Sequence, residues 1–425
     1  MDLPGVVPKT MTEESLLNNE LSPVELVILQ GNSFCNLNCT YCDLSSESRR
    51  TKSVMEPRLI DRLFTDVFSS GLSSPQVKVV WHSGEPLTLP PSYYDEAIDL
   101  ILSLRDRLAP NSVSVRFGIQ TNASLIDDNW CHFFKRHEQR LDLGVSCDGP
   151  IEMHDAFRIN WNGRPSHGLA IRGMDLLAKY GIKYKIIAVV TRKTLLDPEA
   201  FYNFFFDRRR QLSGFHFNVL AEGASSDIDL AYSAEDRSAY YSFYRRLLEL
   251  NQAKRDSGAE FEILNFSQGV ARLLATNTPG APIAFDESTA PLKSLSVDAK
   301  GNVTTFYAGL SIDVLRDEYG DGKGLSLGNI FEMSLDDMAR SHKLQRMMKD
   351  FALSRRACEA ACQYFSVCTG GFEIVKKKSL GSFDVAETPE CVIHVKALVD
   401  ALLDDISKYL ESQPSSEHLT ASSMT

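Results

Sequence analysis

The chain has 425 residues, of which 43% are hydrophobic and 24% charged, as expected for a globular protein of two or three domains with a large core. Its net charge is −11 and no long basic run occurs, so duplex nucleic acid is not expected as a partner, and a small molecule or a peptide is favoured. We find no signal-like N-terminus and no apolar run of about 18 residues, so the sequence predicts a cytoplasmic protein without a membrane partner.

Residues 1–23 are rich in proline and polar side chains and are predicted to form a loosely attached arm. From residue 24 to residue 224, strand-like apolar runs alternate with amphipathic helices, which is typical of βα units around a parallel sheet. A helical bridge is expected at 225–290, with a capping box at 233–236 and a loop at 275–280. A C-terminal domain is expected at 291–411 and a disordered tail at 412–425. Six strands are predicted, at 26–30, 77–81, 113–119, 141–146, 183–190 and 215–220.

The nine cysteines are unevenly distributed along the chain. Cys131 and Cys147 stand alone and are expected to be buried core thiols. In the cytoplasm thiols stay reduced unless they bind metal, so the clustering of the others predicts two metal centres rather than disulfides. The two clusters are Cys35, Cys39 and Cys42 in an early loop, and Cys358, Cys362, Cys368 and Cys391 near the C-terminus.

Polar motifs follow the first four predicted strands. Because chemistry collects at the carboxyl ends of parallel strands, these motifs are expected to meet at one edge of the sheet. Taken singly, each is also ordinary turn or cap chemistry. In chain order they are the cysteine loop, His82-Ser83-Gly84-Glu85-Pro86, Gln120-Thr121-Asn122, and Ser146-Cys147-Asp148-Gly149-Pro150 followed by His154, Asp155 and Arg158.

The octet Cys35-x3-Cys39-x2-Cys42, with Tyr41 before its last cysteine, resembles the signature of the radical S-adenosylmethionine (SAM) enzymes. Three thiolates leave one iron of a [4Fe-4S] cluster open, and the resemblance implies that SAM binds there and is cleaved to a 5′-deoxyadenosyl radical. From the octet alone, a zinc half-site is the alternative. The resemblance also implies the fold class, which is α/β: a partial (β/α)6 TIM-type barrel with a small C-terminal iron-sulfur domain.

The same resemblance assigns SAM contacts to the motifs that follow the strands. The segment after the second strand is similar to the family's GGEP motif, in which backbone groups and the acidic side chain receive the SAM ammonium group. Ser83 replaces its first glycine, a change expected to be tolerated because backbone groups make much of that contact. The expected SAM-binding residues are Tyr41, Ser83, Gly84, Glu85, Pro86, Gln120, Asn122, Ser146, Asp148 and Arg158.

The late cysteines resemble a SPASM extension, which in its full form holds two auxiliary [4Fe-4S] clusters. Phe306 and Phe372 stand where that pattern has cysteines, and both losses fall on the inner auxiliary cluster. One auxiliary cluster is therefore expected, with Cys358, Cys362, Cys368 and Cys391 as its four ligands. On donor chemistry alone, zinc is the alternative.

This resemblance implies an oxidoreductase that acts on a ribosomally made precursor peptide and takes electrons from a donor such as flavodoxin or ferredoxin. The segment from Val80 to Leu87 and the missing inner cluster look most like the maturases that form cyclophane crosslinks between an aromatic ring and a β-carbon. An anaerobic sulfatase-maturating oxidase is the runner-up, weakened by the incomplete cysteine set, and a non-catalytic metal-binding scaffold is the alternative of another class. No catalytic base stands out among Asp298, Glu222 and Tyr307.

Overall fold

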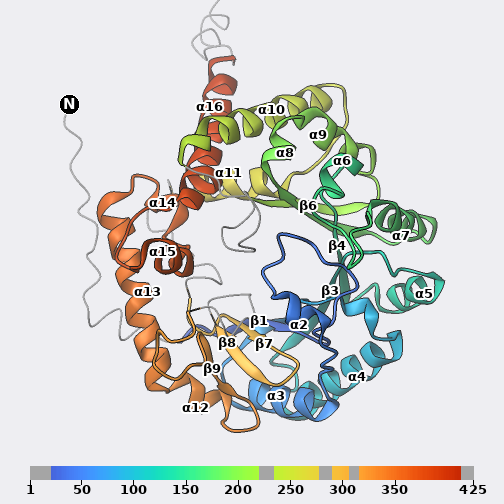
Figure 1. Cartoon of the computed structure of the whole chain (residues 1–425), viewed down its shortest axis with the longest axis vertical. Helices are drawn as coiled ribbons and strands as arrows, with labels where there is room; N and C mark the ends of the chain where they lie inside the picture. The colour runs from blue at the N-terminus through green and yellow to red at the C-terminus, as the bar shows by residue number, and fades with distance from the viewer. Residues whose placement is uncertain (1–20, 220–233, 277–289, 306–314, 413–425) are drawn as a thin grey trace, which may run out of the picture.

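The computed structural model describes residues 21–219, 234–276, 290–305 and 315–412 (Figure 1). Most of the expected arm, nearly all of the expected tail, and Ser233 of the expected capping box lie outside these ranges. So do Glu222, Phe306 and Tyr307.

The described strands form one open sheet in the order β6-β5-β4-β3-β2-β1-β7-β8-β9. All six predicted strands are present, with ends at most four residues from the predicted ones, and β1 to β6 run parallel as the βα pattern indicates. The expected α/β class with an unclosed barrel is thereby confirmed. The strands are β1 (Val24–Leu29), β2 (Ser73–Trp81), β3 (Ser114–Thr121), β4 (Leu141–Ser146), β5 (Tyr184–Val190), β6 (Leu212–Val219), β7 (Ser294–Val297), β8 (Asn302–Thr305) and β9 (Ser326–Asn329).

The sheet continues across the boundary expected between residues 290 and 291. Strand β7 pairs in parallel with β1, Leu26–Leu29 lying against Ser294–Val297, and β8 and β9 follow as antiparallel strands. The sequence does not reveal this pairing, because β7 follows two helices and belongs to no βα repeat. The C-terminal segment therefore adds strands to the same sheet.

Helices cover the outer face of the sheet and continue around it in a ring (Figure 1). The ring closes because α16 packs on α10 and α12 packs on α3. The helices are α2 (Ser46–Arg50), α3 (Pro57–Ser69), α4 (Pro91–Leu108), α5 (Asp128–His137), α6 (Ile151–His154), α7 (His167–Lys179), α8 (Arg192–Leu195), α9 (Pro198–Asp207), α10 (Arg237–Asp256), α11 (Leu264–Thr276), α12 (Leu335–Ala339), α13 (His342–Ala361), α14 (Phe365–Cys368), α15 (Glu373–Leu380), α16 (Ala397–Ser412), the short turns η1 (Pro86–Thr88) and η2 (Ala234–Asp236), and the π-helical turn η3 (Cys391–Lys396).

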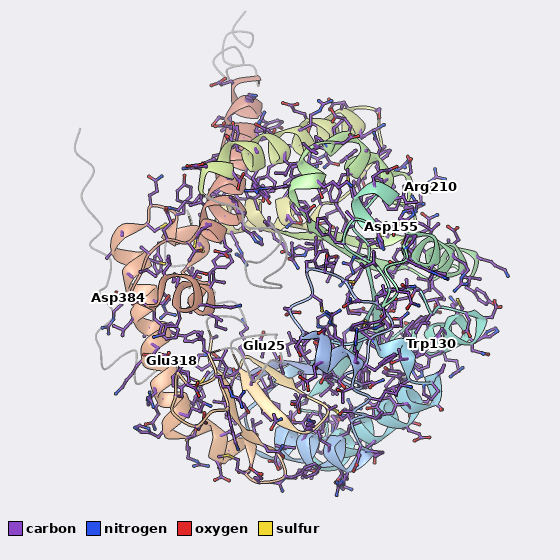
Figure 2. The ribbon with its side chains drawn as sticks, viewed as in Figure 1. Glu25, Trp130, Asp155, Arg210, Glu318 and Asp384 are labelled. Carbon is purple, nitrogen blue, oxygen red and sulfur yellow. The ribbon has the colours of Figure 1, made fainter. Side chains whose placement is uncertain are left out.

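Local sequence signals explain several helix positions. The apolar stripe of α3 is buried as its spacing predicts, and Asp197 caps α9 by accepting a hydrogen bond from the Ala200 N–H at 2.9 Å. Trp130 of α5, which Figure 2 labels, packs on Tyr94 of α4 with ring centroids 5.6 Å apart. The loop expected at 275–280 is wrong at its start, because α11 runs through Thr276.

Candidate active site

The inner face of the sheet carries the site. Along β4 and β5, buried side chains that pack under the outer helices alternate with half-buried ones on the opposite face. Gln120 and Ser146 lie on that inner face and are joined by a 2.8 Å hydrogen bond from Nε2 to Oγ. The bond needs Gly144 beside it, because a Cβ there would lie 1.9 Å from the Gln120 Oε1.

The three early cysteines lie together in the loop after β1. Burial raises the pKa of each thiol, to about 11 for Cys42, and the charge of Cys39 adds to the rise at both Cys35 and Cys42. Without a metal these thiols are protonated at neutral pH, so cluster assembly must release protons. Backbone hydrogen bonds hold the loop, among them Cys35 N–H to the Arg49 carbonyl at 2.9 Å.

The segment after α6 also forms hydrogen bonds with the cysteine loop and holds it in place. The N–H groups of Asn38 and Thr40 donate to the carbonyls of Ile159 and Phe157 at 2.7 and 2.9 Å. The indole N–H of Trp161 donates to the Cys35 carbonyl at 2.8 Å. Nothing in the sequence pattern singles out Trp161, because its role depends on a contact 126 residues away along the chain.

Gly84 brings the motif after β2 against the cysteine loop. Its φ is +70°, and a Cβ at this position would lie 2.4 Å from the Asn32 carbonyl oxygen and 2.9 Å from that of Phe34. Ser83 also has a left-handed backbone, with φ of 72°, which costs a residue with a Cβ roughly 1 kcal/mol. This conformation explains why glycine is the usual residue at the position of Ser83. Pro86, the last residue of the motif, begins the turn η1.

Glu85 is fully buried, and its carboxylate links the segment after β2 to the end of β3 through hydrogen bonds. Its Oε1 accepts from the Leu87 N–H at 2.9 Å and the Thr121 hydroxyl at 2.6 Å, and its Oε2 accepts from the Asn122 N–H at 2.8 Å. Burial raises the pKa of Glu85, and these three hydrogen bonds oppose the rise. Three of the four acceptor positions of the carboxylate are therefore filled within the protein, which leaves one on Oε2 for a ligand.

Asn122 ties the end of β3 to the cysteine loop. Its amide nitrogen donates to Asn36 Oδ1 at 2.9 Å, Asn36 donates to the Ser124 hydroxyl at 2.8 Å, and that hydroxyl donates back to Asn122 Oδ1 at 2.5 Å. The three side chains form a closed ring of hydrogen bonds. Asn122 is thus placed beside the cysteines, as the motif order predicts.

Asp148, Arg158 and Tyr41 form a buried triad. The guanidinium of Arg158 binds both Asp148 oxygens, at 2.9 and 3.0 Å, the Tyr41 hydroxyl donates to Oδ2 at 2.5 Å, and the Val189 N–H donates to Oδ1 at 2.9 Å. All four acceptor positions of Asp148 are filled, so its geometry supports a role in holding Tyr41 and Arg158 rather than direct contact with SAM.

The His-Asp-x-x-Arg stretch has three separate structural roles. Asp155 accepts from the N–H groups of Ser166 and His167 at 2.9 and 2.8 Å, at the start of α7. His154 is buried, and burial and the nearby Arg158 lower its pKa to about 4, so the ring is neutral at pH 7. Arg158 is a member of the triad, and His154 reaches Asp148 through its backbone, with Nδ1 3.4 Å from the Asp148 N–H.

The four late cysteines line one pocket although they come from separate turns. Cys358 and Cys362 lie at the end of α13, Cys368 ends α14, and Cys391 begins η3. Four thiols around one pocket are the donor set that a fully ligated [4Fe-4S] cluster requires, so the residues fit this group. Within the described ranges no three His, Cys, Asp or Glu side chains are gathered tightly enough to hold a single metal ion.

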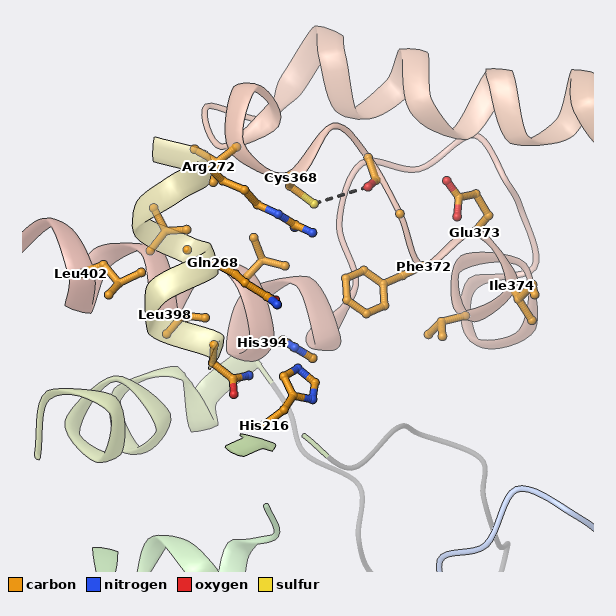
Figure 3. Close-up of a pocket in the computed structure, with 18 of the residues that line it drawn as sticks. His216, Gln268, Arg272, Cys368, Phe372, Glu373, Ile374, His394, Leu398 and Leu402 are labelled. Atoms are coloured by element: carbon orange, nitrogen blue, oxygen red, sulfur yellow. Dashed lines mark hydrogen bonds between the residues drawn. The ribbon is translucent and has the colours of Figure 1, made fainter. Parts of the chain in front are cut away.

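A cavity of about 440 Å³ lies between the barrel and the late cysteines (Figure 3). His216 of β6 faces it from the barrel, Gln268 and Arg272 from α11, and Phe372 and His394 from the C-terminal segment. Burial lowers the pKa of His216, and burial together with His216 and Arg272 lowers that of His394 to about 4. The sequence alone gives His216 no ligand partner at a telling spacing, and the single signal that could have marked it is its place on the inner face of β6.

Of Asp298, Glu222 and Tyr307, among which no catalytic base stands out, the structure describes Asp298 alone. Its carboxylate accepts from the backbone N–H groups of Lys300 and Asn302 at 2.8 and 2.9 Å and from the Asn302 amide at 2.7 Å. Asp298 therefore shapes the β7–β8 turn. Cys131 and Cys147 are fully buried in the core, as expected. No helix in the described ranges is both long and apolar enough to cross a membrane.

Residues 30–205 match the model of the radical SAM superfamily, and they form a radical SAM domain. Members of this family of enzymes bind a [4Fe-4S] cluster and SAM. The cysteine loop and the motifs around it lie within this domain.

Relatives extend the similarity beyond the domain. An uncharacterised protein of Synechocystis is 28% identical over 389 residues, 91% of this chain and 93% of that one. A serine-type anaerobic sulfatase-maturating enzyme of Bacteroides thetaiotaomicron is 36% identical over 188 residues, 43% of each chain. The structure of anSMEcpe with bound AdoMet and Cp18Cys peptide shares the fold, with a TM-score of 0.69, 19% identity, and coverage of 92% of this chain and 99% of that one.

Proposed function

We propose that the protein is a radical SAM peptide maturase that removes hydrogen from a side chain of a ribosomally made precursor peptide and forms a cyclophane crosslink. The cavity between the barrel and the late cysteines is the observation that carries this proposal. It is large enough for side chains of a peptide, its lining is mainly apolar, and it adjoins both the inner face of β6 and Cys368.

In this proposal Cys35, Cys39 and Cys42 hold the SAM-binding cluster, which with SAM supplies the hydrogen abstraction. Glu85 and Asn122 position the cysteine loop against β3, and the Asp148 triad fixes Tyr41 and Arg158 beside it. Burial of Glu85 keeps water from its carboxylate.

Cys358, Cys362, Cys368 and Cys391 would hold one auxiliary [4Fe-4S] cluster, which would supply an acceptor for the one electron that the peptide radical gives up when it loses a proton and forms the crosslink. A second auxiliary cluster has no cysteine ligands left. Of the nine cysteines, seven are assigned and Cys131 and Cys147 are buried in the barrel core. Phe372 stands on the wall of the cavity where the resemblance has a cysteine. A protein electron donor such as flavodoxin or ferredoxin supplies the electron for SAM cleavage.

Sulfatase maturation is the second candidate, favoured by the 36% identity to the Bacteroides enzyme. In that reaction a serine side chain becomes an aldehyde and loses two hydrogens, so its mass change equals that of one crosslink. Mass alone cannot separate the two functions. A hydrazide probe reacts with an aldehyde but not with a cyclophane, and a crosslink suppresses fragmentation between the joined residues.

The first experiment is anaerobic reconstitution followed by iron and sulfide analysis. We expect about eight irons in the wild-type chain and about four in a Cys35/Cys39/Cys42→Ala variant. The reconstituted enzyme is then incubated with SAM, dithionite and peptides encoded beside its gene, and with a serine-containing sulfatase peptide. A hydrazide-negative product lighter by two hydrogens supports a crosslink, and a hydrazide-positive product from the sulfatase peptide would replace this proposal with the second candidate.

A further inference from the structure

A lysine side chain is completely buried next to the late cysteines. Lys376 on α15 has no exposed surface, and its Nζ donates to Cys358 Sγ at 3.0 Å, to the Ser354 hydroxyl at 2.7 Å and to the Ser354 carbonyl at 3.3 Å. Ser354 and Cys358 lie one turn apart on α13 and present these acceptors together. All three N–H groups of the ammonium are therefore used.

The neighbouring lysines show that this burial is particular to Lys376. It belongs to a run of three, in which Lys377 forms an ion pair with Glu318 at 2.8 Å and Lys378 is exposed. Lys396 lines the same pocket as the cysteines, but its charge is matched by the carboxylate of Glu387. Lys376 forms no ion pair with any carboxylate in the described part of the chain.

A buried ammonium destabilises the fold unless an anion offsets its lost hydration. The two Ser354 acceptors are neutral, so Cys358 is the partner of Lys376 that can become anionic. A cysteine that binds a cluster does so as a thiolate. The charge of Lys376 is therefore matched when the site is loaded.

We propose that Lys376 is the counter-ion of the auxiliary cluster and raises its reduction potential through the hydrogen bond to Cys358. Hydrogen bonds to the ligating sulfurs and the net charge around a cluster are known to set its potential. A fixed positive charge stabilises the reduced cluster, which carries one more negative charge than the oxidised cluster. This assignment rests on the auxiliary cluster of the proposed function, and it makes that cluster the better electron acceptor.

The test measures the potential of this cluster alone. The full chain with Cys35/Cys39/Cys42→Ala is reconstituted, and the midpoint is found by redox titration followed by EPR. In this background Lys376→Met removes the charge and the hydrogen bonds, Lys376→Gln keeps a neutral donor, and Lys378→Met is the matched control that removes an exposed charge two residues away.

We expect Lys376→Met to lower the ratio of reduced to oxidised cluster at a fixed potential about tenfold, which equals a shift of about 59 mV to more negative values. Lys376→Gln should move the midpoint in the same direction, and Lys378→Met should leave it in place. If Lys376→Met fails to hold the cluster, Lys376→Gln decides the question.

A midpoint unchanged in the glutamine variant would overturn the assignment and leave Lys376 as a link between α13 and α15. The Cys35/Cys39/Cys42→Ala chain with Lys376 intact tests the auxiliary cluster itself. If the Cys35/Cys39/Cys42→Ala chain holds zinc or no iron, the auxiliary cluster itself is wrong, and the role of Lys376 falls with it.

Discussion

Gly84 lies where the segment after β2 packs against the start of the cysteine loop. Glycine is required there for two reasons: its φ is positive, and there is no space for a Cβ. Gly163 offers a matched control, because it has the same φ of +70° but a Cβ added there would meet no atom within 4 Å. Substituting alanine at either site imposes the left-handed strain, which costs about 1 kcal/mol. At Gly84 the alanine must also push back the carbonyls of residues 32–34.

We therefore expect Gly84→Ala to lower the free energy of unfolding by at least about 2 kcal/mol more than Gly163→Ala does. Denaturant unfolding of the two variants measures this difference. Gly84→Ala should also hold less iron in the early cluster, because Cys35 directly follows Phe34. Equal losses at the two glycines would mean that the cysteine loop shifts freely and that Gly84 is needed only for its φ.

His154 couples stability to pH. Its Nδ1 faces the N–H of Asp148 at 3.4 Å and its Nε2 lies 3.1 Å from the Ser166 hydroxyl, whose own proton goes to the Arg158 carbonyl at 2.6 Å. The ring is therefore neutral with its proton on Nε2, and a second proton would meet the Asp148 N–H. Folding lowers the pKa from 6.5 to about 4, chiefly because the ring is buried.

Because the unfolded chain binds this proton at a higher pH than the folded chain, the contribution of His154 is complete above pH 6.5 and is lost as the pH falls toward 4. A shift of this size corresponds to roughly 3 kcal/mol. His154→Gln keeps an acceptor and a donor but cannot titrate, so its stability should fall less between pH 7 and pH 4.5 than that of the wild type. His132→Gln, at an exposed histidine of α5, should retain the wild-type slope.

At the scale of elements, the sequence predicts what is locally encoded. All six strands of the repeat are recognisable from their apolar runs, and β4 begins and ends at the predicted residues. A strand that is buried under helices must carry apolar side chains within its own segment, so its sequence alone reveals it. The order of the motifs also predicts that Glu85, Asn122 and Asp148 lie near the cysteines. The hydrogen bonds that these side chains make across the fold could not be predicted, because the partners are far away along the chain: Thr121 is 36 residues from Glu85, and Tyr41 is 107 residues from Asp148.

The pairing of β7 with β1 and the burial of Lys376 escape prediction for the same reason. A four-residue strand carries little periodicity, and three consecutive lysines indicate a solvated surface unless the fold supplies a partner for one of them. The late cysteines are recognisable by spacing, but their shared pocket depends on how α13, α14 and η3 pack together.

The Asp148 triad connects the cysteine loop, the segments after β4 and α6, and strand β5. The balance of charge between Asp148 and Arg158 can be tested. Asp148→Asn leaves the buried Arg158 without its counter-ion, which typically costs 3–5 kcal/mol. Asp142→Asn on β4, the strand that precedes Asp148, is the control, because Asp142 is half-exposed and pairs with Lys78 and Arg116 at the surface, where each such pair is worth about 1 kcal/mol or less.

Thermal and denaturant unfolding of both variants measures the difference. Adding Arg158→Met to Asp148→Asn should restore part of the loss, because the unpaired charge is then gone. A double variant no more stable than Asp148→Asn alone would show that Asp148 acts mainly through its hydrogen bonds to Tyr41 and Val189.

At the scale of the whole molecule, the C-terminal segment extends the sheet of the barrel as well as carrying the four late cysteines. Strand β7 covers the edge of β1, with backbone hydrogen bonds such as Gln30 N–H to the Val297 carbonyl at 3.0 Å. Helix α16 covers α10, and the buried Tyr244 hydroxyl donates to the Ile393 carbonyl at 3.1 Å. The radical SAM domain thus depends on residues far beyond the matched range of 30–205.

A chain that ends at residue 290 would expose the β1 edge and the apolar side of α10 together. We expect it to aggregate, because an unpaired strand edge and an uncovered helix face both promote association. A chain that ends at residue 412 keeps every described strand and helix and is the control. Soluble yield and size-exclusion chromatography compare the two, and co-expression of residues 291–425 should rescue the shorter chain. If the chain of residues 1–290 is instead a monomer that unfolds cooperatively, the barrel folds without β7, and the C-terminal segment is an independent domain that docks onto a finished sheet.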